Sequence, residues 1–228
     1  MRSGTLPQRC SAARTLRVQA IGSESTDEVV QLLVALLEQD DAECKAAAAM
    51  GLANMCVSSP GGQVILGNER QVLLELLALL RAPDPYIQAD AAWAIAALTE
   101  DPVVQVRARG MEGMLAALVE VLQKGSEEGK AAAATALWNA SANHAGQKGS
   151  VGASDGVLWG LVSLLREDDA VGKAAAAGAL WNLCCRNSEN CARVRDIPHA
   201  RALLRHLASH GDDACRKWAG DALCVIEF

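Results

Sequence analysis

Aromatic residues are scarce in this chain of 228 residues, which has five tryptophans, one tyrosine and one phenylalanine. Few residues here favour strands, so a protein built on β-sheet is not expected. Alanine supplies most of the apolar surface instead, and it has the highest helix propensity of all residues. With 51% hydrophobic and 21% charged positions, the chain can still bury a sizeable core. We therefore expect a soluble, all-α protein with closely packed helices.

The chain also lacks an excess of positive charge and long apolar runs. Its formal net charge is −6 and its pI is near 5.3. A surface that neutralises phosphates needs clustered lysine and arginine, so we do not expect nucleic-acid binding. A membrane-spanning helix needs about 18 consecutive apolar residues. The stretch Gln71–Leu80 is among the longest apolar runs and is interrupted by Glu75, so membrane insertion is not expected either.

Phosphate-binding motifs are missing as well. The sequence has neither a GxGxxG nor a GxxxxGK[ST] glycine-rich loop. His206 and His210 lie four residues apart and are the strongest metal candidates. Residues of ligand type follow them at Asp212, Asp213 and Cys215. This histidine spacing is common on exposed helices and lacks an HExxH context. We predict no metal, no cofactor and no enzymatic activity.

The eight cysteines contain no CxxC pair. Several lie inside helical patterns, where a free thiol behaves as a small buried apolar group. Cys184, Cys185 and Cys191 are close in sequence, but no histidine is placed beside them, so a thiol enzyme is not expected. We predict reduced cysteines, which favours an intracellular protein.

An internal repeat dominates what is present. Five segments align without gaps, and their starts at 45, 88, 130, 173 and 216 are separated by 42 or 43 residues. They read KAAAAMGLAN, QADAAWAIAA, KAAAATALWN, KAAAAGALWN and RKWAGDALCV. A leucine-rich stretch precedes each of the first four and ends at Leu37, Leu80, Leu122 and Leu165. Helix propensity alone does not explain recurrence in phase over five repeats.

Each repeat predicts three helices. A short polar segment with Asp, Gly or Pro separates the leucine-rich stretch from the alanine-rich stretch, which is typical of a turn and a helix N-cap. A looser stretch with a short apolar piece follows and predicts a short helix. Lys130 and Lys173 begin alanine-rich helices, where we expect them to be solvent-exposed. One repeat cannot bury its leucine-rich helix alone, so stacked neighbours must share a core.

The domain boundaries follow from the repeat phase. Residues 27–228 form the repeat domain, and residues 1–26 form a partial repeat helix or an N-terminal extension. The first 23 residues contain four arginines and no acidic residue, a composition that also fits an organelle transit peptide. Neither end shows a polar outer face, so we expect self-association through uncapped ends. The five repeats span residues 27–68, 69–110, 111–153, 154–196 and 197–228.

The segments GLANMC (51–56), ALWN (136–139) and GALWNLC (178–184) resemble the third helix of armadillo repeats, which typically reads A-L-x-N-L. The A-L-W-N-L form is most similar to plant and protist armadillo proteins. The resemblance covers residues 27–228 and implies a right-handed α-solenoid, or superhelix, of about five three-helix repeats plus a partial N-terminal one. It also implies an intracellular protein of the cytoplasm or nucleus, with organelle targeting by residues 1–23 as the alternative.

In the armadillo family, an asparagine of the third helix hydrogen-bonds the backbone of an extended peptide in a concave groove. The resemblance places this role on Asn54, Asn139 and Asn182, whereas Ala97 and Val225 replace it in the second and fifth repeats. Losing both Asn139 and Asn182 is therefore expected to abolish binding and to change fold stability far less.

Tryptophan positions argue against a nuclear import receptor. In those receptors a tryptophan stands one turn before each asparagine, and only Trp93 matches here, without its asparagine. Trp138 and Trp181 immediately precede their asparagines, rotated by about 100° around the helix. We therefore predict that these two indoles pack between adjacent repeats.

Helical spacing adds further positions to the predicted groove. Asp90, Trp218, Asp101, Asn143 and Arg186 are among them. With Asp221, the acidic residues make the groove mildly acidic, so it suits an extended peptide that is neutral or basic.

The sequence thus predicts a non-catalytic protein-protein interaction scaffold or adaptor. Alternatives are the substrate-recognition region of a U-box-type ubiquitin ligase and a divergent nuclear-import-type adaptor. Binding through another face than the groove is a further alternative.

Overall fold

The computed structural model describes residues 33–37, 41–58, 69–142, 148–154, 156–167 and 169–227. Residues 1–26 and Asn143 lie outside these ranges, as does the side chain of Asn54, so the predictions on them stay predictions. All regular structure in the described ranges is helical. The chain divides into two compact units, Met1–Met114 and Leu115–Phe228, and each is described by itself.

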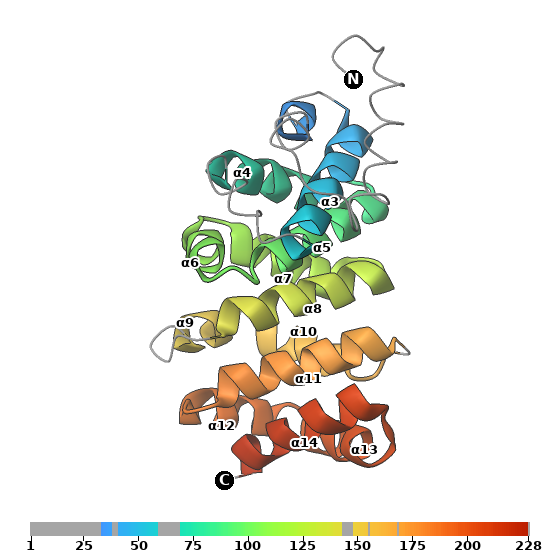
Figure 1. Cartoon of the computed structure of the whole chain (residues 1–228). Helices are drawn as coiled ribbons and strands as arrows, with labels where there is room; N and C mark the ends of the chain where they lie inside the picture. The colour runs from blue at the N-terminus through green and yellow to red at the C-terminus, as the bar shows by residue number, and fades with distance from the viewer. Residues whose placement is uncertain are drawn as a thin grey trace. The chain divides into compact units, whose positions relative to one another are not determined.

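The N-terminal unit contains two alanine-rich helices that pack against each other, α3 (Ala42–Ser58) and α5 (Pro85–Leu98). The leucine-rich helix α4 (Glu69–Leu80) packs against both, and α6 (Pro102–Gly110) follows α5 (Figure 1). Alanines fill the contact between α3 and α5, and most of them are fully buried. Small side chains let the two helices approach closely, which accounts for the alanine runs.

The C-terminal unit repeats the predicted order of short, leucine-rich and alanine-rich helices. The helices are α7 (Met114–Lys124, from the unit boundary), α8 (Glu127–Ser141), α9 (Lys148–Ala153), α10 (Val157–Leu164), α11 (Ala170–Cys184), α12 (Ser188–Asp196), α13 (Ala200–His210) and α14 (Asp213–Glu227). The alanine-rich third helices α8, α11 and α14 run side by side (Figure 1). The predicted three-helix repeat is confirmed for these helices.

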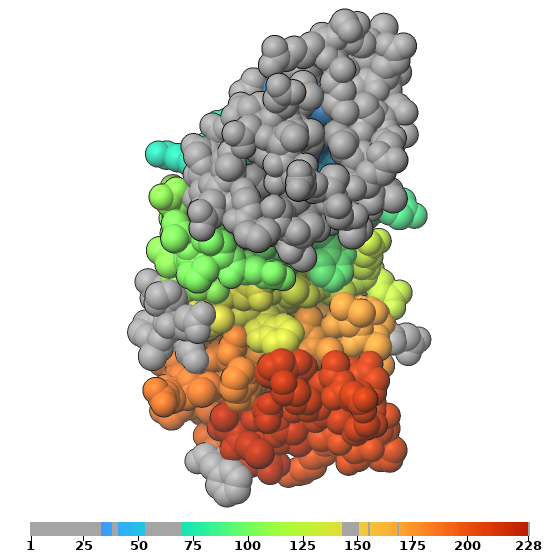
Figure 2. All heavy atoms as spheres, viewed as in Figure 1, coloured from blue at the N-terminus to red at the C-terminus, as the bar shows by residue number. Residues whose placement is uncertain are grey.

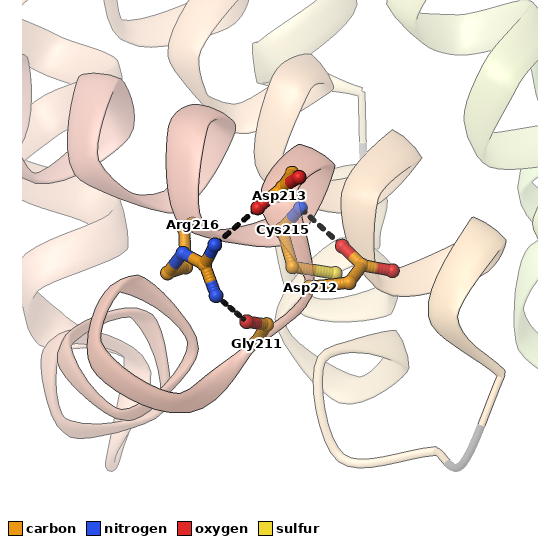
Figure 3. Close-up of polar contacts among 5 residues, drawn as sticks. All are labelled: Gly211, Asp212, Asp213, Cys215 and Arg216. Carbon is orange, nitrogen blue, oxygen red and sulfur yellow. Dashed lines mark hydrogen bonds and ion pairs between the residues drawn. The ribbon is translucent and has the colours of Figure 1, made fainter.

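Each third helix begins with a side-chain cap. The five capping residues recur every 42 or 43 residues and are Asp41, Asp84, Ser126, Asp169 and Asp212. Figure 3 shows the last one, in which the Asp212 carboxylate accepts a hydrogen bond from the Cys215 backbone N–H at 2.7 Å. A cap of this kind stabilises a helix by about 1 kcal/mol. The turn-and-cap interpretation of the polar segments is confirmed at all five positions.

Two lysines at the start of third helices form ion pairs instead of projecting into solvent. Lys45 contacts Glu75 at 2.7 Å, and Lys130 contacts Glu167 at 3.0 Å. Each pair joins a third helix to the following repeat. The expectation of a solvent-exposed Lys130 is therefore wrong, because its ammonium group is held by a carboxylate from the next repeat. Partly exposed pairs of this kind contribute about 1 kcal/mol or less.

The exposed side of α14 is polar. Asp221 and Glu227 are at least partly exposed there, at the positions where α11 carries the buried Gly178 and Cys184. Arg216 and Lys217 add exposed charges to the same helix. The exposed side of α14 therefore carries charged residues, whereas self-association through the ends of the chain stays a prediction. None of the helices in the described ranges has the length and apolar character needed to cross a membrane.

Candidate functional site

Three tryptophans from successive third helices form one cluster in the C-terminal unit. The Trp138 ring of α8 meets the Trp218 ring of α14 edge to face, with 4.6 Å between centroids and 76° between planes. The Trp181 ring of α11 lies 5.5 Å from that of Trp218 at 42°. All three residues are partly exposed. On the face shown in Figure 2, atoms of α8, α11 and α14 come together.

A glycine makes the cluster possible. A Cβ atom at Gly178 of α11 would lie 2.7, 2.8 and 2.9 Å from three ring atoms of Trp138. The Trp138 indole therefore lies over the bare backbone of α11, and this lets it reach α14 two repeats along the chain. The prediction that Trp138 and Trp181 pack between repeats is confirmed by these contacts. Because the rings are also partly exposed, they form a surface as well as a packing contact.

The asparagine of the fourth repeat has a structural partner. Asn182 is 8% exposed, and its Nδ2 donates a hydrogen bond to the Trp138 backbone carbonyl at 3.2 Å. That carbonyl also accepts a hydrogen bond from Ser141 Oγ at 2.8 Å. The Asn182 amide thus joins α11 to α8. The expectation that its loss spares fold stability needs correction, since a partly buried hydrogen bond between two repeats would be lost.

The remaining predicted groove residues lie in different settings. Asn139 is half-buried on α8, and Arg186 is exposed just after α11 with a φ of 60°. Asp90 and Trp93 are half-buried on α5 of the N-terminal unit, three residues apart. The Asp101 carboxylate caps α6 by accepting hydrogen bonds from Val103 and Val104. Asn54 lies on α3, with its side chain outside the description.

Charge near the cluster comes from α14 itself. The Lys217 Nζ atom lies 4.3 Å from the centroid of the Trp218 ring, which is a cation–π contact. Asp221 follows Trp218 by one helical turn and is half-buried. Sequence reasoning missed Lys217. A signal was present, because the fifth repeat reads RKWAG where the third and fourth read KAAAA.

The buried thiols are poorly suited to nucleophilic chemistry. Burial raises the pKa of Cys184, and the neighbouring Cys191 thiol raises it further. Burial and the Asp212 carboxylate raise the pKa of Cys215 to about 11. These two thiols therefore stay protonated at neutral pH, and the thiolate is the nucleophilic form.

The two histidines contact each other on α13. The His206 and His210 rings are stacked with 4.7 Å between centroids, and His210 Nδ1 lies 3.2 Å from the His206 backbone oxygen. In the described ranges, no three ligand-type side chains come together in a way that could hold a metal ion. The Asp212 carboxylate is engaged in capping α14.

Comparison with known proteins places the fold. A family profile for the HEAT-like repeat matches residues 42–98. An engineered protein of known structure is 27% identical, with a TM-score of 0.84, and the match covers 99% of this chain and 92% of that one. No curated protein matches.

Two designed armadillo repeat structures are also similar. One set, designed computationally for modular peptide recognition, is 25% identical with a TM-score of 0.76, covering 97% of this chain and 99% of that one. Another, in complex with the peptide (KR)4, is 24% identical with a TM-score of 0.76, covering 98% and 100%. The chain is thus an all-α repeat protein whose fold is similar to that of armadillo repeat proteins.

Proposed function

We propose that this chain is a non-catalytic interaction module that binds an extended, basic or neutral segment of a partner protein. The binding site is the tryptophan surface, which consists of Trp138, Trp181 and Trp218 with the neighbouring Asn139 and Asp221. The observation that carries the proposal is the continuous cluster of partly exposed indoles across α8, α11 and α14.

Indole rings suit this task physically. Tryptophan is among the residues that contribute most to binding at protein interfaces, because a rigid ring covers a large area at low entropic cost. The three rings come from successive repeats, so an extended segment lying across the third helices contacts them in turn. The Asn139 amide can donate and accept hydrogen bonds, as a peptide backbone requires.

Charge favours a basic or neutral segment over an acidic one. Asp221 lies one turn from Trp218, and the whole chain carries a formal net charge of −6. A negative potential raises the association rate of a positively charged ligand. Proteins of similar fold have been designed for modular peptide recognition, which supports peptide binding by this chain.

An octapeptide of alternating lysine and arginine, labelled with fluorescein, tests the proposal by fluorescence anisotropy. We expect binding by the wild-type chain, and we expect Trp218→Ala to weaken it by about tenfold, the effect of losing roughly 1.4 kcal/mol. Trp159→Ala is the matched control, because Trp159 is 58% exposed on α10, outside the tryptophan surface. Equal losses in the two variants, or no binding by the wild type, would refute the proposal.

A further inference from the structure

The Trp218 ring already contacts a positively charged group of this chain, the ammonium group of Lys217. The Lys217 Nζ atom lies 4.3 Å from the ring centroid, well within the roughly 6 Å range of a cation–π contact. Two other indoles, Trp138 and Trp181, contact the same ring. Lys217 itself is exposed, so the core does not require its side chain. The geometry therefore identifies a part of the Trp218 ring that attracts a cation.

The sequence introduces the lysine and the indole together. The position of Lys217 is occupied by alanine in the four other repeats, at Ala46, Ala89, Ala131 and Ala174. The position of Trp218 is occupied by Ala47, Asp90, Ala132 and Ala175. The other third helices thus show that neither residue is needed to form this kind of helix. The fifth repeat differs from them by placing a cation beside an aromatic ring.

From this pairing we infer that the Trp218 ring is the site for one cationic side chain of the bound segment, and that Lys217 is its internal competitor. An incoming lysine or arginine side chain takes the place of the Lys217 ammonium group, which moves into solvent. The inference rests on the proposed function, because it concerns the same surface. It predicts that the free protein partly blocks its own site.

The adjacent cation provides a matched control. Arg216 precedes Lys217 on α14 and is also exposed. Its guanidinium donates a hydrogen bond to the Gly211 backbone oxygen at 2.9 Å and contacts the Asp213 carboxylate (Figure 3). Removing the charge of either residue lowers the positive charge of the chain equally. Of the two, Lys217 is the one whose charged group contacts the Trp218 ring.

The test compares Lys217→Met with Arg216→Met, using the labelled lysine–arginine octapeptide. Methionine keeps an unbranched apolar side chain and removes the charge. We expect Lys217→Met to bind the octapeptide about two- to fivefold more tightly than wild type, the range that corresponds to an exposed cation–π contact. For Arg216→Met, the increase in affinity for the octapeptide should be less than half of the increase for Lys217→Met. In a Trp218→Ala background, the gain from Lys217→Met should disappear. Melting curves by circular dichroism check that all variants are folded.

The outcomes separate the two ideas. If Trp218→Ala weakens binding but Lys217→Met and Arg216→Met have equal effects, the proposed function stands and the competitor role is overturned, because the gain is then a general charge effect. Weaker binding by Lys217→Met also overturns it, since the lysine would then assist the ligand. If the octapeptide binds neither the wild type nor Lys217→Met, both the function and the inference fail.

Discussion

Replacing Gly178 with alanine should destabilise the protein, although alanine is the better helix former. The new Cβ atom would lie 2.7 to 2.9 Å from the Trp138 ring, closer than a carbon–carbon contact allows. The backbone of α11 is held by α8 and α14, so the indole has to move. Its displacement breaks the contact between Trp138 and Trp218. The substitution therefore tests the geometry of the tryptophan surface directly.

The magnitude follows from three terms. Alanine in place of glycine within a helix gains about 0.5–1 kcal/mol. Overpacking a filled site costs about 1–3 kcal/mol, and loss of an aromatic pair costs about 0.5–1.5 kcal/mol. The costs exceed the gain, so we expect a net loss of about 0.5–4 kcal/mol. In a chain of this size that corresponds to a fall in Tm of roughly 1–16 °C.

Urea unfolding followed by circular dichroism and tryptophan fluorescence measures this loss. Gly220→Ala is the matched control, because Gly220 lies on α14 and no atom lies within 4 Å of a Cβ built there. That variant should be stabilised by about 0.5–1 kcal/mol from helix propensity alone. If Gly178→Ala is stabilised to the same extent, the Trp138 ring does not lie over Gly178 and our description of the surface is wrong.

Three further predictions follow from the same contacts. Asn182→Ala should lower the free energy of unfolding by about 1–2 kcal/mol in a urea titration, because a partly buried hydrogen bond between α11 and α8 is lost; an unchanged value would contradict that role. At pH 7, iodoacetamide should modify the exposed Cys224 long before the buried Cys184 and Cys215, as followed by mass spectrometry; equal rates would show that the thiols are not buried. Hydrogen bonding to Cys215 lowers the pKa of Asp212, so its stabilising effect is present above the ordinary carboxyl pKa and is lost as the pH falls through the lowered value. The stability difference between wild type and Asp212→Ala should therefore close on acidification, and a difference that widens would reverse this assignment.

The fold could be read from the sequence because its signals are local and recur. Alanine and leucine runs mark two helices of each repeat, and a capping residue such as Asp84 or Ser126 stands at a constant distance before each third helix. Because the pattern recurs every 42 or 43 residues, it predicts that the repeats stack on one another, since only neighbouring repeats can bury the apolar faces of the helices.

The tryptophan surface could be predicted only in part. Helical spacing predicted inter-repeat packing for Trp138 but not its reach across Gly178 to Trp218, because that contact joins helices two repeats apart. The direction of the Asn182 amide was also missed. Its register position matches a peptide-binding residue of armadillo proteins, but here the Trp138 backbone carbonyl near the end of α8 lies within its reach. Register fixes the position of a residue on a helix, whereas its hydrogen-bond partner depends on the neighbouring helix.

The most direct test of the central claim is an NMR titration that follows the indole N–H signals of the five tryptophans as the lysine–arginine octapeptide is added. Each indole has one N–H donor, so each tryptophan gives its own signal. We predict that the signals of Trp138, Trp181 and Trp218 shift together with one dissociation constant, while the signal of the exposed Trp159 stays in place. A shift of Trp159 with the three cluster signals unchanged would contradict the claim, because the peptide would then bind away from the third helices.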